Sequence, residues 1–344
     1  MVKTTHVRKN QKKRTPLYNH STNEYTGSVD KPRVLGIDEY IKAFPLGDEP
    51  TELSMETPHD LDKTIKFDEL THTYFVCFDP INSPGSFTSE GNTSVSGIVH
   101  KYFNEFDPIE AIHKMRNGRN WNKHNKYYGM TNKEISDGWK RNALEASSRG
   151  TWCHGQLEKC MNGFDLYSAP YSGLIQFQQF FKWKKNHFDG KLVPFRTELR
   201  FRSCKELKMT GTADLIAIDP NHPPPEDTQG VLTLHLKDWK FSKAIKETNR
   251  YQSGKGICQS LDDTNLSHYI IQQNLYKWFL EHIYNEWVWK GKQYTSVEVS
   301  TMELCVFHEN HGTDGLVVPI PDMYELIDAI VEERRESIVN SLLL

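Results

Sequence analysis

Residues 231–241, VLTLHLKDWKF, alternate apolar and polar side chains as a β-strand does. Successive side chains on a strand point to opposite faces, so one face carries three leucines followed by Asp238 and Lys240. Burying a carboxylate and an ammonium group is costly unless each has a partner. The pattern therefore has two interpretations: a salt bridge at the end of the strand, or a metal ligand beside a catalytic lysine.

The preceding strand, residues 210–218 (TGTADLIAI), places Asp214 among small and aliphatic side chains. A lone carboxylate in such a strand needs a cation. Residues 220–230, PNHPPPEDTQG, are typical of a turn, and a hairpin through them would make Asp214 and Asp238 neighbours. Two carboxylates with a backbone carbonyl form an oxygen-rich site suited to Mg²⁺ or Mn²⁺.

A divalent metal at this site would lower the pKa of a water and neutralise charge that develops on a phosphate. Lys240 would then orient or deprotonate the water, or stabilise the transition state. The pattern is compatible with phosphodiester hydrolysis without a covalent intermediate.

Helices and strands alternate along the rest of the chain. Thr131 and Glu134 match a capping box, and the helix that follows runs past Gly150, which we expect to kink or split it, to Leu157. Residues 94–103 fit either a helix or a strand. Further helices are expected over 174–187, 268–284 and 323–338, and further strands over 71–77, 195–202, 209–218 and 297–307. This order predicts an α/β (α+β) fold with a central mixed β-sheet flanked by helices.

The N-terminal stretch is basic, with no acidic residue before Glu24. We expect residues 1–64 to be a largely disordered tail and residues 65–344 to be the folded domain. The tail could contact phosphates or act as a nuclear localisation signal, or it could simply be a solvated segment. A nucleic-acid binder is often basic overall, so the formal net charge of −3 argues against one, but it leaves room for a local basic patch. No apolar run is long enough to span a bilayer, and the N-terminus has no secretory apolar segment.

Several segments resemble a known family of enzymes. Gly211–Asp214 followed by Asp238-Trp239-Lys240 resembles the G-x-x-D … D-x-K core of PD-(D/E)XK nucleases. Residues 150–158, GTWCHGQLE, are similar to the G-T-x-x-H-x-x-x-E helix of the RecB-like branch, and residues 272–276, QQNLY, to its Q-x-x-x-Y helix. The segments follow the order and spacing of that branch. The resemblance covers residues 65–338 and implies a restriction-endonuclease-like core.

The resemblance implies roles for individual residues. Asp214, Asp238 and Lys240 would be catalytic, and His154 would bind metal together with the two aspartates. His154 and Glu158 are four positions apart and share a helix face, and on the resemblance Glu158 could be a group that supports the metal ligands. Glu198 stands where the family carries an acidic residue; it is either a metal or supporting ligand or a charge on the strand surface.

On the same resemblance, Gln272 and Tyr276 would support the active centre and contact DNA; the alternative is a core tyrosine beside a satisfied amide. Basic residues within and just after the D-x-K strand could hold phosphates, or could form a solvated face: Lys237, Lys243, Lys246, Arg250 and Lys255. Trp152, Trp239 and Tyr251 could stack bases, but Trp239 points away from the Asp238 face and is better placed for the core.

The six cysteines are scattered and form no C-x-x-C pair. Cys258 and Cys305 alone follow the D-x-K strand, whereas some RecB-like nucleases hold an iron–sulfur cluster with three cysteines there. We therefore expect no iron–sulfur cluster. The resemblance then points to cluster-free exonucleases similar to phage and mitochondrial genome maintenance exonucleases. No P-loop motif occurs, so we expect cleavage without ATP.

These observations lead to one expected function. The chain would be a Mg²⁺- or Mn²⁺-dependent deoxyribonuclease, an exonuclease on single-stranded or end-exposed DNA that serves replication, recombination or repair. The alternatives are a structure-selective endonuclease and an inactive DNA-binding protein of the same fold. DNA is the expected partner, membrane association is not expected, and protein partners stay open. An intracellular location is expected, with nucleus, cytoplasm, mitochondrion and a phage or viral origin left open.

Overall fold

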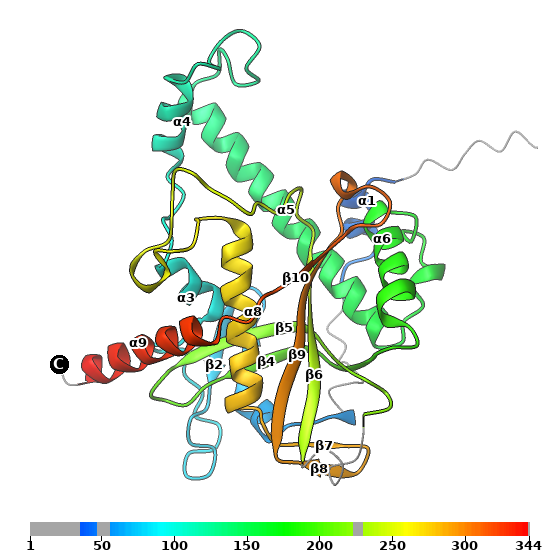
Figure 1. Ribbon diagram of the computed structural model, residues 1–344. Helices are drawn as coiled ribbons and strands as arrows, with labels where there is room; N and C mark the ends of the chain where they lie inside the picture. Colours follow the sequence, from blue (N-terminus) through cyan, green and yellow to red (C-terminus); the bar gives the residue numbers. More distant parts are fainter. Residues whose placement is uncertain (1–34, 47–55, 223–229, 343–344) are drawn as a thin grey trace, which may run out of the picture. The chain divides into compact units, whose positions relative to one another are not determined.

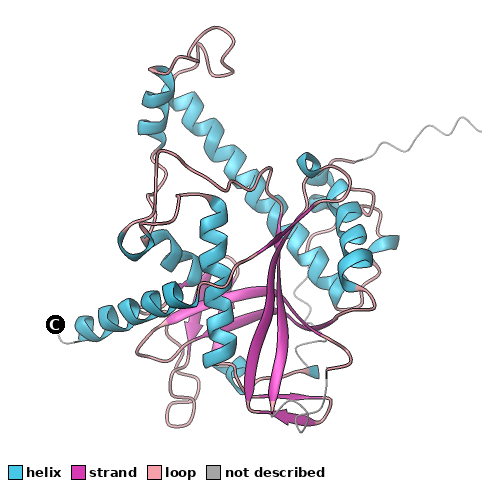
Figure 2. Ribbon diagram, viewed as in Figure 1, coloured by secondary structure: helices cyan, strands magenta, loops and turns pink. Residues whose placement is uncertain are grey.

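Strand β5 (Met209–Ile218) lies within a six-stranded mixed sheet, seen in the computed structural model in Figures 1 and 2. The structure describes residues 35–46, 56–222 and 230–342. The chain divides into two units, Met1–Phe44 and Pro45–Leu344, and the described part of the first contains helix α1 (Ile37–Ala43). All features below belong to the second unit.

The sheet order is β10-β9-β6-β5-β3, with β4 paired to β5. β5 pairs antiparallel with β4 and β6, while β6 pairs in parallel with β9, and β3 in parallel with β5. The sheet is therefore mixed, as the sequence predicted, and the expected antiparallel pairing of β5 with β6 is confirmed. The turn expected over residues 220–230 falls largely on 223–229, outside those described. The remaining strands of this sheet are β3 (Thr93–Ser94), β4 (Val193–Arg202), β6 (Val231–Lys240), β9 (Ser296–Val306) and β10 (Leu316–Pro319).

Helices flank the sheet (Figure 2). They are α3 (Val95–Lys101), α4 (Pro108–Arg116), α5 (Asn132–Met161), α6 (Ile175–Trp183), α8 (Asn265–His282) and α9 (Tyr324–Leu342). Two hairpins complete the domain: β1 (Ile65–Asp68) with β2 (Thr73–Val76), and β7 (Trp287–Trp289) with β8 (Lys292–Tyr294). No helix in the described ranges is both long and apolar enough to cross a membrane.

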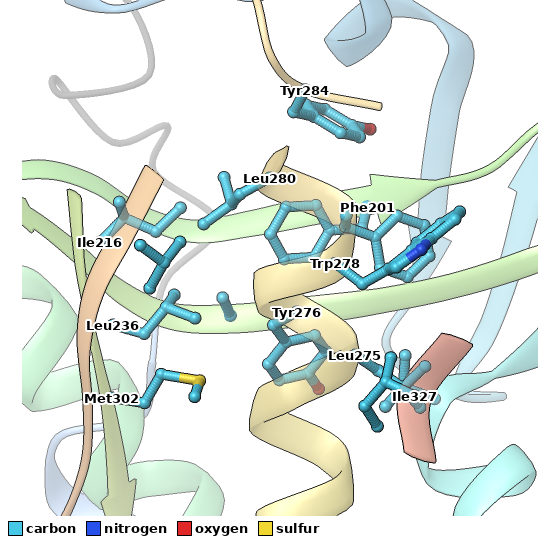
Figure 3. Packing of buried hydrophobic residues seen from close by; sticks show 14 of the residues in the cluster. Phe201, Ile216, Leu236, Leu275, Tyr276, Trp278, Leu280, Tyr284, Met302 and Ile327 are labelled. Atoms are coloured by element: carbon cyan, nitrogen blue, oxygen red, sulfur yellow. The ribbon is translucent and has the colours of Figure 1, made fainter. Parts of the chain in front are cut away.

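Helix α8 packs against one face of the sheet (Figure 3). Leu275, Tyr276 and Phe279 of this helix belong to one buried cluster with Leu236 of β6 and Phe201 of β4. The three leucines of β6 point into this cluster, which satisfies the apolar face that the alternation predicted. The strand pattern thus placed the leucine face correctly.

The opposite face of β6 packs on α6. Trp239 is fully buried in an aromatic group, with ring centroids 5.0 Å from Trp183, 5.8 Å from Phe180 and 6.0 Å from Phe307. Trp239 is therefore a core residue and cannot stack a base. The core position expected for Trp239 is therefore confirmed. Trp152 is also buried, against Tyr171 and Phe177, so the suggestion that it could stack a base is wrong.

Helix α5 begins where the sequence predicted. Thr131 accepts the backbone N–H of Glu134, and the Glu134 carboxylate accepts the N–H of Thr131. The helix then runs for 30 residues without interruption, so the expected split at Gly150 is wrong, while the kink stays a prediction. A methyl group at position 150 would meet no atom within 4 Å.

Several shorter elements differ from expectation. Residues 94–103 form mainly helix α3, and the helix expected over 174–187 changes after Trp183 into a π-helical turn over Lys184–Phe188. Helix α4 and strands β7, β8 and β10 were not predicted. Each of these elements is at most nine residues long, too short for a periodic pattern to stand out.

Residues 56–64 are attached to the sheet, where the sequence suggested loose organisation. Thr57 donates a hydrogen bond to the carbonyl of Phe195, and Arg196 forms an ion pair with Asp62 at 3.0 Å. A short 3-10 helix covers Asp60–Thr64. The basic tail expected before this segment falls largely on residues 1–34, outside those described.

Candidate metal centre and catalytic lysine

The sheet splits beside β5. Along one edge, β5 pairs with β3 at Met209 and Thr210, and with β6 at residues 215–217. The other edge pairs with β4. Residues 211–214, the GTAD segment, lie between the part of β5 that pairs with β3 and the part that pairs with β6. On this edge, which we call the split edge, these four residues have no ladder partner. Polar side chains can enter a sheet at such a gap, and the candidate site is built there.

Asp214 stands where the β5–β6 ladder ends. The last paired residues are Leu215 and Lys237, and beyond them Oδ2 of Asp214 accepts the backbone N–H of Trp239 at 2.7 Å. The side-chain carboxylate thus takes the place of a ladder acceptor. This bond holds Asp214 next to Asp238, as the expected hairpin required.

His154 of α5 and Glu198 of β4 join Asp214 from two other elements. Nδ1 of His154 lies 3.4 Å from Oδ2 of Asp214, and ligand atoms of His154, Glu198 and Asp214 all lie within 4.8 Å of one another. All three side chains are partly exposed, so an ion could reach them. The structure thus brings together His154 and two of the three acidic residues that the sequence pointed to as metal ligands, Glu198 and Asp214, while Asp238 is not part of this group.

Glu198 has an unusual backbone. Its φ is +45°, in the left-handed region that costs a non-glycine residue free energy. Its neighbours Thr197 and Leu199 pair with Leu215 and Ala213, so Glu198 lies across the ladder from Asp214. Of the two interpretations left open for Glu198, the arrangement favours a ligand or supporting group over a charge on the strand surface.

Asp238 and Lys240 form the second half of the site. The Lys240 ammonium is ion-paired with Oδ2 of Asp238, and Gln273 of α8 donates to Oδ1 of Asp238 at 2.8 Å. The ammonium also lies 4.8 Å from the ring centre of Tyr269, on the same helix. Asp238 is buried and Lys240 is largely so, which matches the alternation of β6.

The charges of this group perturb one another. Burial raises the pKa of Glu198 well above its usual range, and the carboxylates of Asp214 and Glu158 raise it further. Burial also raises the pKa of Asp238, to about 6, although Lys240 opposes this rise. For Asp214, burial is outweighed by His154 and Lys240, so its pKa is lowered. Several carboxylates gathered in one partly buried site repel one another, and a bound cation would relieve that repulsion.

The donor set fits a divalent metal. Two carboxylates and one imidazole nitrogen converge from three elements, with Asp238 next to them. Oxygen donors suit Mg²⁺, and a single imidazole also suits Mn²⁺. The same residues could hold such an ion without a change in fold.

Gln272 and Tyr276 lie on α8, the helix whose Gln273 contacts Asp238. Nε2 of Gln272 donates to the Tyr276 hydroxyl at 3.0 Å, and the Tyr276 ring stacks on Phe201 in the core. A methyl group added at Gly211 would lie 2.8 Å from the Tyr276 ring. The QQNLY helix therefore packs directly on the GTAD strand, and Tyr276 supports the site from the core.

The other predicted residues lie outside the group of candidate metal ligands. Glu158 is partly buried one turn after His154, and burial raises its pKa. Lys243 is exposed after β6, and its carbonyl accepts a hydrogen bond from Asn310. Lys237 is buried and ion-paired with Glu303 at 2.7 Å, so the expectation that it contacts phosphate is wrong.

Gln273 was missed. The sequence contains two adjacent glutamines, and the family pattern drew attention to Gln272. Four-residue spacing places Gln273 on the same helix face as Tyr269, and both contact the Asp238–Lys240 pair. A buried glutamine facing a D-x-K strand is the signal that could have found it.

No family model matches the chain, and no curated protein matches it.

Proposed function

We propose that the chain is a metal-dependent deoxyribonuclease similar to the PD-(D/E)XK nucleases of the RecB-like branch, with a restriction-endonuclease-like core. One observation carries the proposal. His154, Glu198 and Asp214 converge at the split in the sheet, directly beside the ion pair of Asp238 and Lys240. Carboxylates, an imidazole and a lysine in this arrangement suit metal-assisted hydrolysis of a phosphodiester.

In this proposal His154, Glu198, Asp214 and Asp238 hold Mg²⁺ or Mn²⁺. The metal, when bound, supplies a Lewis acid that neutralises phosphate charge and acidifies water. Asp214 keeps its position through the N–H of Trp239, and Gln273 keeps the Asp238 carboxylate oriented. Held in this way, the two carboxylates need little rearrangement when the substrate binds.

Lys240 brings positive charge to the phosphate. An ammonium group ion-paired with Asp238 is a donor and cannot accept a proton. Its part is therefore to donate to a phosphate oxygen and to stabilise the negative charge that develops there. Glu158, Gln272 and Tyr276 act through the residues that they pack against.

The proposed substrate is single-stranded or end-exposed DNA, attacked by an exonuclease in replication, recombination or repair. The chain would need no iron–sulfur cluster, since Cys258 and Cys305 are the only cysteines after the D-x-K strand. An intracellular setting fits this role.

Digestion of labelled DNA tests the proposal. Linear single strands and duplexes labelled at either end are incubated with Mg²⁺, Mn²⁺ or EDTA. We expect cleavage with either metal, none in EDTA, and a loss of at least a hundredfold in Lys240→Ala. Lys185→Ala, which removes an exposed lysine from the π-helical turn after α6, is the matched control. Undiminished cleavage by Lys240→Ala would refute the mechanism.

A circular single strand separates the remaining alternatives. A strict exonuclease leaves the circle intact, whereas a structure-selective endonuclease opens it. A protein that binds DNA but cleaves neither linear nor circular DNA with any metal would be an inactive DNA-binding member of the same fold.

A further inference from the structure

Two pockets meet beside the candidate site. The inner pocket, of about 410 Å³, is lined by Lys240, His100, Tyr269 and Gln272. The outer pocket, of about 670 Å³, is lined by Lys246, Arg250 and Tyr251 of the loop between β6 and α8. Both are also lined by Asn265 and His268, so the two pockets adjoin at these residues, and together we call them the groove, with Lys240 at its inner end (Figure 1 shows the loop and α8).

The outer end of the groove carries unpaired positive charge. Lys246 and Arg250 are exposed, and neither forms an ion pair with a described carboxylate. Asp263, which also lines this pocket, is already bonded to His268 at 3.0 Å. Two free cations beside an acidic residue that has a partner favour a ligand with negative charge.

Tyr251 adds an aromatic surface. Its side chain is 94% exposed at the rim of the outer pocket, with no core to cover it. An exposed aromatic ring next to free cations is the combination with which proteins hold an unpaired nucleic-acid strand, since bases stack on the ring while phosphates meet the cations.

The loop that carries these groups is held in place. Asn265 accepts the backbone N–H of Lys246 and donates to the carbonyl of Ala244, at 2.8 and 2.9 Å. Asn249 also anchors the loop: its backbone N–H donates to Asp262 and its side-chain amide donates to the carbonyl of Asp263, both at 2.8 Å. The backbone that carries the cations and the ring is therefore held in place, which lowers the entropy cost of binding.

We infer that this groove binds an unpaired DNA strand that leads to the cleavage site, with phosphates at Lys246 and Arg250 and a base on Tyr251. The inference rests on the proposed nuclease function for its substrate class, and it adds where the strand lies. A paired base cannot offer its face to Tyr251, so the groove distinguishes single strands from duplexes.

Binding in EDTA tests the inference without any cleavage. The affinity of the full chain for a fluorescent oligodeoxythymidylate is measured at several salt concentrations. We expect Lys246→Ala and Arg250→Ala each to reduce the slope of log affinity against log salt by about 0.7, as the loss of one phosphate contact does for single strands. We expect Tyr251→Ala to weaken binding about tenfold at an unchanged slope, as the loss of one stacked base does.

Two controls match these variants. Lys185→Ala removes an exposed lysine elsewhere, and Tyr324→Ala removes an exposed tyrosine at the start of α9. Both should bind as the unaltered protein does. A hairpin duplex of the same length should bind more weakly and should not respond to Tyr251→Ala.

The results separate the groove from the nuclease proposal. If the three groove variants bind like their controls while the protein cleaves DNA, the groove inference fails and the nuclease proposal stands. If the variants lose binding as expected but no metal supports cleavage, the groove inference stands and the nuclease proposal fails. The groove inference would be overturned if the variants lost as much affinity for the duplex as for the single strand, or if the unaltered protein did not bind the oligonucleotide at all.

Discussion

The backbone N–H of Trp239 donates a hydrogen bond of 2.7 Å to Oδ2 of Asp214. The main chain and the side chain of residue 239 therefore have separate roles. Its main chain fixes a candidate metal ligand, while its indole ring packs on the other side of the sheet against Trp183 and Phe307. Because the two parts face opposite ways, side-chain substitutions at this position can separate stability from catalysis.

Trp239→Phe should keep cleavage and lose little stability, because the N–H and an aromatic core group both remain. Trp239→Ala should lower the free energy of unfolding by about 3–5 kcal/mol through the cavity that it leaves. Urea denaturation, together with cleavage assays at a temperature where both variants are folded, checks this. Loss of cleavage in a stably folded Trp239→Phe would mean that the indole itself takes part in the site.

Glu198→Gln should raise stability in EDTA and weaken metal binding. The carboxylate is desolvated and lies close to Asp214 and Glu158, so its removal relieves repulsion, although the left-handed backbone stays. Calorimetric titration with MnCl₂ should show an affinity reduced at least tenfold, and urea denaturation in EDTA should show a higher midpoint. Glu145→Gln, at an exposed position of α5, is the control and should change neither value. Unchanged Mn²⁺ affinity in Glu198→Gln would remove Glu198 from the ligand set.

Gln273→Leu should lower the free energy of unfolding more than Gln272→Leu does. The first variant leaves Oδ1 of buried Asp238 without its amide donor, which costs about 1–3 kcal/mol. The second breaks a bond to the Tyr276 hydroxyl in a partly exposed setting and should cost about 1 kcal/mol or less. Denaturation of both variants measures the difference. Gln273→Leu should also cleave DNA more slowly at saturating substrate, because Asp238 loses its orientation; equal rates in the two variants would argue against that positioning role.

Two glycine-to-alanine substitutions should act in opposite directions. Gly150→Ala adds a methyl group to an unbroken helix where nothing lies within 4 Å, so it should stabilise the protein by about 0.5–1 kcal/mol. Gly211→Ala places a methyl group 2.8 Å from the Tyr276 ring and 3.1 Å from Val95, so it should destabilise the protein and displace Tyr276. Thermal denaturation checks both. A destabilised Gly150→Ala would indicate strain in α5 that its geometry does not reveal.

His59 should make stability depend on pH. Burial against Tyr284 and Trp287 lowers the pKa of His59. The carboxylates of Asp62 and Asp60 oppose this lowering, whereas Arg196 and Arg202 add to it. Nδ1 of His59 accepts the backbone N–H of Leu61. The unfolded chain thus binds a proton more readily, so this contribution is present above pH 6.5 and is lost as the pH falls below it.

The measurement compares His59→Asn with the unaltered protein. Asparagine can still accept the N–H of Leu61 but does not titrate in this range. The difference in unfolding free energy between the two proteins should therefore shrink as the pH falls from 7 to 5. A difference that is constant over this range would show that His59 does not carry the effect.

Much of the sheet could be predicted because its strands are long and alternate clearly. The bounds of β5 were predicted to the residue, and those of β6 to within one residue, since apolar alternation and the turn between them are local signals. The capping box of α5 was likewise local. Short elements such as β10 depend on a neighbour, here β9, that no local pattern reveals.

The candidate site could be predicted in its parts but not in its arrangement. Asp214, Asp238 and Lys240 follow from strand patterns, and His154 from a helix motif. The left-handed backbone of Glu198 and the contact of Gln273 with Asp238 depend on how strands and helices pack. Alternation along β6 puts Lys237 and Lys240 on opposite faces, but it does not show that Lys237 pairs with Glu303 on β9 while Lys240 pairs with Asp238 beside the candidate metal centre.

The split in the sheet also affects how the protein must fold. Its polar groups come from positions as distant as His154 and Gln273, on α5, β4, β5, β6 and α8. Contacts between such distant positions form slowly, because long loops must close before the contacts stabilise anything. The centre therefore takes shape only when most of the domain has folded, so a metal that binds there would protect the whole cooperative unit, and no short fragment of the chain should retain it.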